Sequence, residues 1–189
     1  LYNERSIRKV LSALYQNNEL LISGEYPFRL NDFVLKKYKA IYSALYNLYS
    51  LGNSNIDISD ITGYFQQQVS IYSKFVEDGG MDALYEICND TTSLNFEYNY
   101  SLMKKYALLT DLQQAGIDVS DLYDVTLEPE KLEKQLAVFN AMEIEDIFKH
   151  YNLKLNNIQS NYENFLEKTC ITAGEDLDEL VRSLQTLPE

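Results

Sequence analysis

The chain has 189 residues, of which 46% are hydrophobic, and its formal net charge at pH 7 is −13. It is long enough to bury a core, and it has neither a signal-peptide segment at its start nor an apolar run near the roughly 18 residues of a membrane span. Because nucleic acid is bound through clustered Lys and Arg, so acidic a chain is a poor candidate for binding it tightly alone. We expect a soluble, cytoplasmic protein that makes no membrane contact.

The clearest predicted helix runs from residue 31 to residue 52, and we expect the rest of the chain to be organised around it. Asn31 or Asp32 can cap its start, and Gly52 can end it in the left-handed conformation. Apolar residues recur between them at steps of four and three, which places them on one face of a helix. This stripe consists of Val34, Tyr38, Ile41, Leu45 and Leu48.

Shorter helices are predicted on both sides of this one. Asn3 can cap a helix that runs to about Gln16, and Ser59 can cap another that runs to about Gln68. Gly79 and Gly80 then break the chain before a short helix over residues 81–89. Because no segment here is long enough to build a sheet, the sequence predicts an all-α fold with a globular helical head over residues 1–93.

From Asn95 the predicted helices become longer and their apolar stripes narrower. One stripe runs to Gly116, and Pro129 suits the first turn of the next helix, so residues 94–170 are expected to form a helical hairpin and its extension. A third stripe spans about three heptads, and so long and narrow a seam favours association between helices. The third stripe consists of Ile144, Ile147, Tyr151, Leu155, Ile158, Tyr162 and Phe165.

The last segment, residues 171–189, is predicted to be a linker followed by an acidic amphipathic helix. Its apolar positions share one helical face, while its other positions are mostly polar or charged. A terminal helix of this kind suggests that its binding surface belongs to another domain or chain. The apolar face includes Leu177, Leu180, Val181 and Leu184.

The sequence carries no recognisable catalytic, cofactor or metal motif. It contains no Gly-x-x-x-x-Gly-Lys-Ser/Thr phosphate loop and no Gly-x-Gly-x-x-Gly motif. Cys88 and Cys170 are far apart and are expected to be buried thiols, and the only histidine, His150, belongs to no nucleophile motif. Acidic runs at residues 143–146 and 175–179 could hold a divalent cation, but they lack the EF-hand pattern. We therefore expect no catalytic site in this chain.

Eight packing motifs follow one another in an order that is informative as a whole. This order resembles the N-terminal domain of DnaB-type replicative DNA helicases, in the form common in phages and mobile elements of Gram-positive bacteria. The resemblance is best over residues 4–116. The motifs are Val10–Leu14, Asn31–Gly52, Ile56–Ile58, Gly79–Leu84, Asn95–Tyr100, Lys105–Leu109, Phe139–Ile147 and Glu175–Glu189.

The resemblance implies a collar, that is, a ring of three dimers of such domains above six ATPase domains. The parent protein would be an ATP-dependent DNA helicase that uses ATP and Mg²⁺ and contacts DNA mainly through an ATPase domain outside this chain. The collar would bind primase and, in some systems, a helicase loader. The hairpin would pair with a second subunit through Tyr98, Leu102, Tyr106, Leu109, Leu132, Leu136 and Phe139.

The resemblance also implies that the last helix packs on the ATPase domain of a neighbouring subunit through Leu177, Leu180, Val181 and Leu184. Three alternatives stay open at this point. The hairpin stripes can form an intramolecular three-helix core, and the chain can be the helicase-binding adaptor domain of a primase. The third is an enzyme with a carboxylate-based metal site, which a metal-dependent melting temperature would reveal.

Overall fold

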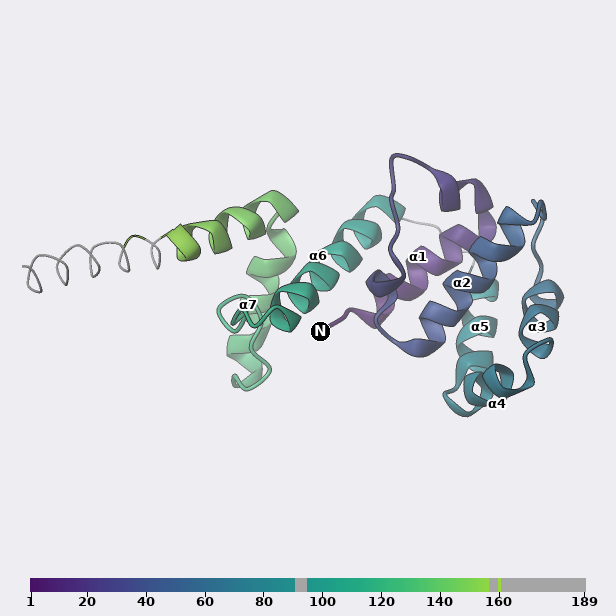
Figure 1. Cartoon of the computed structure of the whole chain (residues 1–189). Coiled ribbons are helices and arrows are strands. Elements are labelled where there is room, and N and C mark those ends of the chain that lie inside the picture. The colour runs from purple at the N-terminus through teal and green to yellow at the C-terminus, as the bar shows by residue number, and fades with distance from the viewer. Residues whose placement is uncertain (91–94, 157–159, 161–189) are drawn as a thin grey trace, which may run out of the picture. The chain divides into compact units, whose positions relative to one another are not determined.

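The computed structural model describes residues 1–90, 95–156 and 160, and this part of the chain is helical between its turns, without a strand. The predicted all-α fold class is thus confirmed. The chain divides into two compact units, Leu1–Ala141 and Met142–Glu189. The elements of the first unit (Figure 1) are α1 (Glu4–Gln16), η1 (Asn18–Ile22), η2 (Leu30–Phe33), α2 (Lys36–Ser50), α3 (Ile58–Gln66), α4 (Val69–Glu77), α5 (Gly80–Asn89), α6 (Phe96–Gln114) and α7 (Pro129–Ala141).

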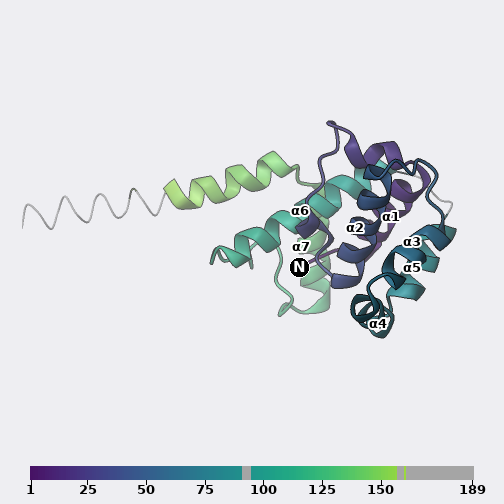
Figure 2. The same ribbon diagram turned by 45° about the vertical axis from the view of Figure 1, so that its right-hand side comes forward.

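Helix α1 lies at the centre of the head and begins where its cap was predicted. The Oδ1 atom of Asn3 accepts a hydrogen bond of 2.9 Å from the backbone N–H of Ser6, which satisfies one of the free donors of the first turn. One face of α1 packs on α5, another packs on α6, and α2 also contacts it (Figures 1 and 2). The buried apolar side chains of α1 are Ile7, Val10, Leu11, Ala13 and Leu14.

The organising helix has the predicted end and the predicted stripe from Tyr38 to Leu48, but it begins later than predicted, so Val34 of the stripe lies outside it. Gly52 has a φ of +95°, and the backbone N–H of Asn53 bonds to the carbonyl of Leu48, as a left-handed helix end requires. At the other end, residues 30–33 form the separate 3₁₀ helix η2, and Val34 has a φ of +27°. A β-branched residue in this region interrupts the helical conformation, so α2 starts at Lys36 rather than at Asn31 or Asp32.

Two further helices differ from the sequence prediction. Helix α3 starts at Ile58 and is capped by Asp57, whose Oδ1 accepts from the backbone N–H of Asp60 at 2.9 Å, so Ser59 is not the cap. Helix α4, over residues 69–77, was not predicted at all. The helix predicted after Gly79 and Gly80 is present as α5, and Pro129 opens α7 as expected.

The second unit begins at Met142, and its described residues are helical over 144–156. In the third predicted stripe, Ile147 and Tyr151 are buried and Leu155 is exposed, while the stripe from residue 158 onward lies outside the described residues. The predicted domain boundaries at residues 93 and 170 also lie outside the described residues and stay predictions. No helix in the described part of the chain is both long and apolar enough to cross a membrane.

Candidate functional site

The residues predicted at a subunit interface fall into three groups by exposure. Four of them are buried in the single chain, two are half-buried, and Tyr98 is 56% exposed. Burial within one chain is what the alternative of an intramolecular core predicts, whereas exposure is what a free interface requires. The buried residues are Leu102, Tyr106, Leu109 and Phe139, and the half-buried ones are Leu132 and Leu136.

Helix α7 covers the middle of α6 through an aromatic contact. The ring of Phe139 meets the ring of Tyr106 edge-on at 5.1 Å between centroids, and Tyr123 approaches the same ring at 5.7 Å. Edge-to-face pairs of this kind stabilise beyond the area that they bury. The Nζ atom of Lys105 donates a 2.7 Å hydrogen bond to the carbonyl of Asn140, which fixes the end of α7 on α6. Burial raises the pKa of Tyr106 to about 12, so its hydroxyl stays neutral under ordinary conditions.

The loop between α6 and α7 is held by one glutamine of α7. The Nε2 atom of Gln135 donates to the carbonyl of Ser120 at 2.8 Å, and its Oε1 atom accepts from the backbone N–H of Asp124 at the same distance. Within the loop, the carboxylates of Asp118 and Asp124 each accept from a backbone N–H two residues later, as in Asx turns. The acidic residues here therefore order the loop.

A buried carboxylate joins the head to α6. The side chain of Asp32, in η2, is fully buried; its Oδ2 atom is 2.8 Å from the Nζ atom of Lys104 of α6. Its Oδ1 atom is 2.9 Å from Nη2 of Arg29, and the backbone N–H of Arg29 donates to Oδ2 at 2.7 Å. Arg29 also reaches α6 itself, since its Nη2 atom lies 2.9 Å from Oδ2 of Asp111. Buried charges are tolerated only when they are paired and hydrogen-bonded, and Asp32 meets both conditions.

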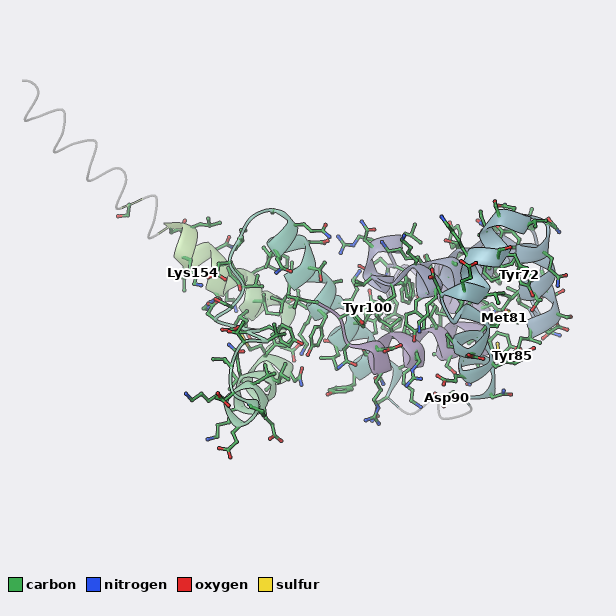
Figure 3. The ribbon with its side chains drawn as sticks, turned by 90° about the horizontal axis from the view of Figure 1, so that it is seen from below. Tyr72, Met81, Tyr85, Asp90, Tyr100 and Lys154 are labelled. Carbon is green, nitrogen blue, oxygen red and sulfur yellow. The ribbon has the colours of Figure 1, made fainter. Side chains whose placement is uncertain are left out.

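An aromatic cluster reinforces the same junction. The hydroxyl of Tyr100, whose side chain Figure 3 shows where α6 meets the head, donates to the carbonyl of Pro27 at 2.9 Å. Tyr26 packs edge-on against Phe96 and Tyr100 at 5.0 and 5.2 Å, and Phe28 meets Tyr100 at 5.3 Å. Burial raises the pKa of Tyr100 to about 12. The segment before η2 is thereby tied to the first turns of α6.

Sequence reasoning missed this junction as a unit. Asp32 was assigned to a helix cap, and Lys104, which is 72 positions away, carried no signal that the two would meet. The run Tyr26, Pro27 and Phe28 offered a partial signal, because Pro27 disfavours helix at the residue before it and the apolar side chains on both sides can hold such a connecting segment on the fold. Nothing in their spacing identified α6 as the surface that they contact.

No group of three or more His, Cys, Asp or Glu in the described part of the chain is arranged to hold a metal ion. In the run at 143–146, Asp146 accepts from the backbone N–H of Glu143 at 3.4 Å and its carboxylate lies 3.3 Å from Lys149. Cys88, which was expected to be buried, is half-buried, and this partial burial raises the pKa of its thiol to about 11, which makes it a poor nucleophile. The ring of His150 packs edge-on against Tyr151 at 5.1 Å. Cys170 and the linker residues Leu177, Leu180, Val181 and Leu184 lie outside the described residues.

Comparison with known proteins finds a similarity to one prophage-derived protein. The chain is 26% identical over 191 residues to the SPbeta prophage-derived uncharacterized protein YorI of Bacillus subtilis strain 168. The match includes the whole of this chain, which spans 38% of the length of that protein. No protein-family model matches the chain. No solved structure matches it either.

Proposed function

We propose that the chain is the N-terminal collar domain of a hexameric DnaB-type replicative DNA helicase encoded by a phage or prophage. One observation carries the proposal: the motifs of the resemblance that lie in the head and in the first turns of α6 contribute to one core. Val10 and Leu11 from α1, Ile41 from α2 and Leu84 from α5 belong to it, and Phe96 and Tyr100 from α6 pack against it. Motifs that are only packing patterns gain weight when they pack on one another.

The similarity to the prophage protein supports the same proposal. That protein continues well beyond the matched region, since the chain spans 38% of its length. A collar domain requires such a continuation, because the ATPase domain, with its ATP and Mg²⁺, lies elsewhere in the parent protein. In this proposal the chain itself has no catalytic site, and it binds other copies of itself, a primase and, in some systems, a helicase loader. Its last helix couples the collar to the ATPase domain, and that domain makes most of the DNA contacts.

A second candidate is the helicase-binding adaptor domain of a primase, which needs no ring of its own. The observation that favours it is the burial of Leu102, Tyr106, Leu109 and Phe139 within a single chain. If these side chains are already covered, the hairpin offers less surface for a second subunit. What remains available on α6 and α7 includes Tyr98, which is 56% exposed, and Val138, which is 64% exposed.

The molar mass in solution distinguishes the two candidates. Light scattering across a tenfold range of concentration should give a dimer, or a trimer of dimers, for a collar and a strict monomer for an adaptor. Glutamate introduced at Leu109 would disrupt a buried position and confuse folding with assembly, so Tyr98→Glu and Val138→Glu are the better variants. Each should shift the equilibrium toward monomer without lowering the melting temperature.

Leu51→Glu is the matched control, because Leu51 is highly exposed at the end of α2 and lies outside the hairpin. It should leave the molar mass unchanged. The contrary result is a wild-type chain that is monomeric at every concentration, with the same molar mass in all three variants. That result would contradict self-association through α6 and α7 and leave the adaptor as the better candidate.

A further inference from the structure

Helix α4 is attached to the head by few contacts. Seven of its nine residues are exposed, Tyr72 is half-buried, and Phe75 is its only buried side chain. Figure 3 shows Tyr72 at the same edge of the head as Met81 and Tyr85 of α5. Within the described part of the chain, no side chain of α4 forms a hydrogen bond or an ion pair with another helix. The attachment of α4 therefore depends on how Phe75 and Tyr72 pack on the core.

The two helices that flank α4 in the sequence are held more firmly. Helix α3 buries both Ile61 and Phe65. Helix α5 buries four of its ten residues, and the carbonyl of its Ile87 accepts a hydrogen bond of 2.8 Å from the Oγ atom of Ser12 in α1. A segment with few buried contacts can open at a low free energy while better anchored segments stay folded. In this part of the head, α4 is that segment.

Two hollows lie between α4 and α2. One, of about 450 Å³, is lined by residues that include Lys36 and Ala40 of α2 and Ile71 and Lys74 of α4. The other, of about 220 Å³, is lined by residues that include Ala40 and Ser43 of α2 and Ile71 of α4. Side chains that face a gap lack the van der Waals contacts of a close-packed interior. Helix α2 therefore adds little to the attachment of α4.

Phe75 is held in a slot that requires glycine at position 80. Its ring stacks on the ring of Phe65 at 4.4 Å between centroids. A Cβ atom added at Gly80 would overlap both the ring and the backbone carbonyl of Phe75. The slot thus closes around one aromatic side chain, and a single methyl group is enough to expel it.

Both ends of α4 have a backbone conformation that suits a hinge. Gln68, which precedes the helix, has φ −124° and ψ 80°, and its side chain forms no capping hydrogen bond. Gly79, which follows Asp78 at the other end, has a φ of +70°, a value that glycine adopts without strain. Hinges are a few residues at the ends of elements that take up the change in backbone angles. Helix α4 can therefore move without bending α3 or α5.

We propose that α4 is a hinged flap that detaches from the head as a unit when Phe75 leaves its slot, while α1, α2, α3 and α5 stay folded. Nine residues are too few to keep a detached helix folded in water, so the flap unfolds when it opens. Opening uncovers Phe65, which is 3% exposed in the closed head. A molecule that prefers one of the two states shifts the balance between them. The inference is independent of the collar proposal, because it uses only residues of the head.

Amide hydrogen exchange of the full chain, followed by nuclear magnetic resonance, tests the proposal. After correction for intrinsic exchange rates, the amides of residues 73–76 in α4 should exchange at least about tenfold faster than those of residues 62–66 in α3 and 84–88 in α5. Exchange in α4 should also depend only weakly on urea, because a local opening exposes little surface. Exchange in α3 and α5 should depend on urea more steeply.

Two variants that disturb the slot make the test specific. Gly80→Ala expels the ring, and Phe75→Ala removes it, so in both the resonances of residues 69–77 should lose their helical chemical shifts. The resonances of α1, α3 and α5 should keep theirs. Gly63→Ala is the matched control, because a Cβ atom added at Gly63 in α3 meets no other atom within 4 Å. It should leave the chemical shifts of α4 unchanged.

Three results would overturn the proposal. The first is exchange in α4 that is as slow as in α3 and α5 and has the same urea dependence, because α4 would then open only when the whole head unfolds. The second is a Gly80→Ala variant in which α4 keeps its helical chemical shifts. The third is loss of helical chemical shifts in α3 and α5 together with α4 in both slot variants.

Discussion

The Asp32–Lys104 pair gives the sharpest prediction for the stability of the fold. Lys104→Met removes one cation from a carboxylate whose side chain is fully buried and leaves Arg29 as its remaining charged partner. Loss of one partner from a buried pair costs about 3–5 kcal/mol when no other compensates, so with Arg29 still bound we expect about 2–3 kcal/mol. Asp32→Asn should cost less, about 1–2 kcal/mol, because Lys104 and Arg29 are 17% and 56% exposed and can be hydrated.

The double variant measures the interaction itself. If Asp32 and Lys104 stabilise each other, the combined loss should fall short of the sum of the single losses by about 1 kcal/mol or more. Urea unfolding followed by circular dichroism gives the loss of unfolding free energy for each single variant and for the double variant, relative to the wild type. The comparison requires that the dependence of this free energy on urea concentration is the same in all of them. Lys131→Met, at an exposed position of α7, should change stability by less than about 0.5 kcal/mol. Losses that add within about 0.5 kcal/mol would refute the pairing.

Two further predictions concern titratable groups. The hydrogen bond that Tyr38 donates to Glu4 at 2.6 Å, together with nearby Lys37, lowers the pKa of Glu4 from its ordinary 4.5. The ionised Glu4 therefore stabilises the fold above pH 4.5, and this stabilisation is lost as the pH falls through the pKa of Glu4 in the folded protein. Tyr38→Phe should therefore lower the free energy of unfolding at neutral pH by about 1 kcal/mol, a modest loss because Glu4 is half-exposed. This difference from the wild type should shrink in acid, and a difference that does not depend on pH would contradict the prediction. With the pKa of its half-buried thiol raised to about 11, Cys88 should react slowly with a thiol reagent at pH 8 in a Cys170→Ser background until the chain is unfolded, and rapid reaction in the native state would contradict the raised pKa.

The sequence predicted what depends on local spacing and missed what depends on distant contacts. The Asn3 cap, the stripe of α2 from Tyr38 to Leu48 and the left-handed end at Gly52 are each determined within a few helical turns, and all three are present. The start of α2 was wrong because the carboxylate of Asp32 is used by Arg29 and Lys104 rather than by a helix N-terminus. Helix α4 is an exception, because Val69, Tyr72 and Val76 recur at helical steps of three and four, so its local spacing was informative and was overlooked.

The same distinction applies to the predicted interface. An apolar stripe on α6 shows that a surface must be covered, but it does not show whether the cover comes from the same chain or another. For Tyr106 the cover includes Tyr123 and Phe139 of this chain. For Tyr98 the question stays open to experiment, because its side chain is largely exposed.

Uncovered apolar surface is therefore more extensive on α4, which belongs to the head, than on the described part of α6. This difference gives a test of which surface holds copies of the chain together. Tyr98→Glu should lower the molar mass of an assembly held by α6 and α7, and Ile71→Ser should leave that molar mass unchanged. If Ile71→Ser instead dissociated the assembly, α4 would be a contact between copies of this chain, and the collar would assemble through its heads.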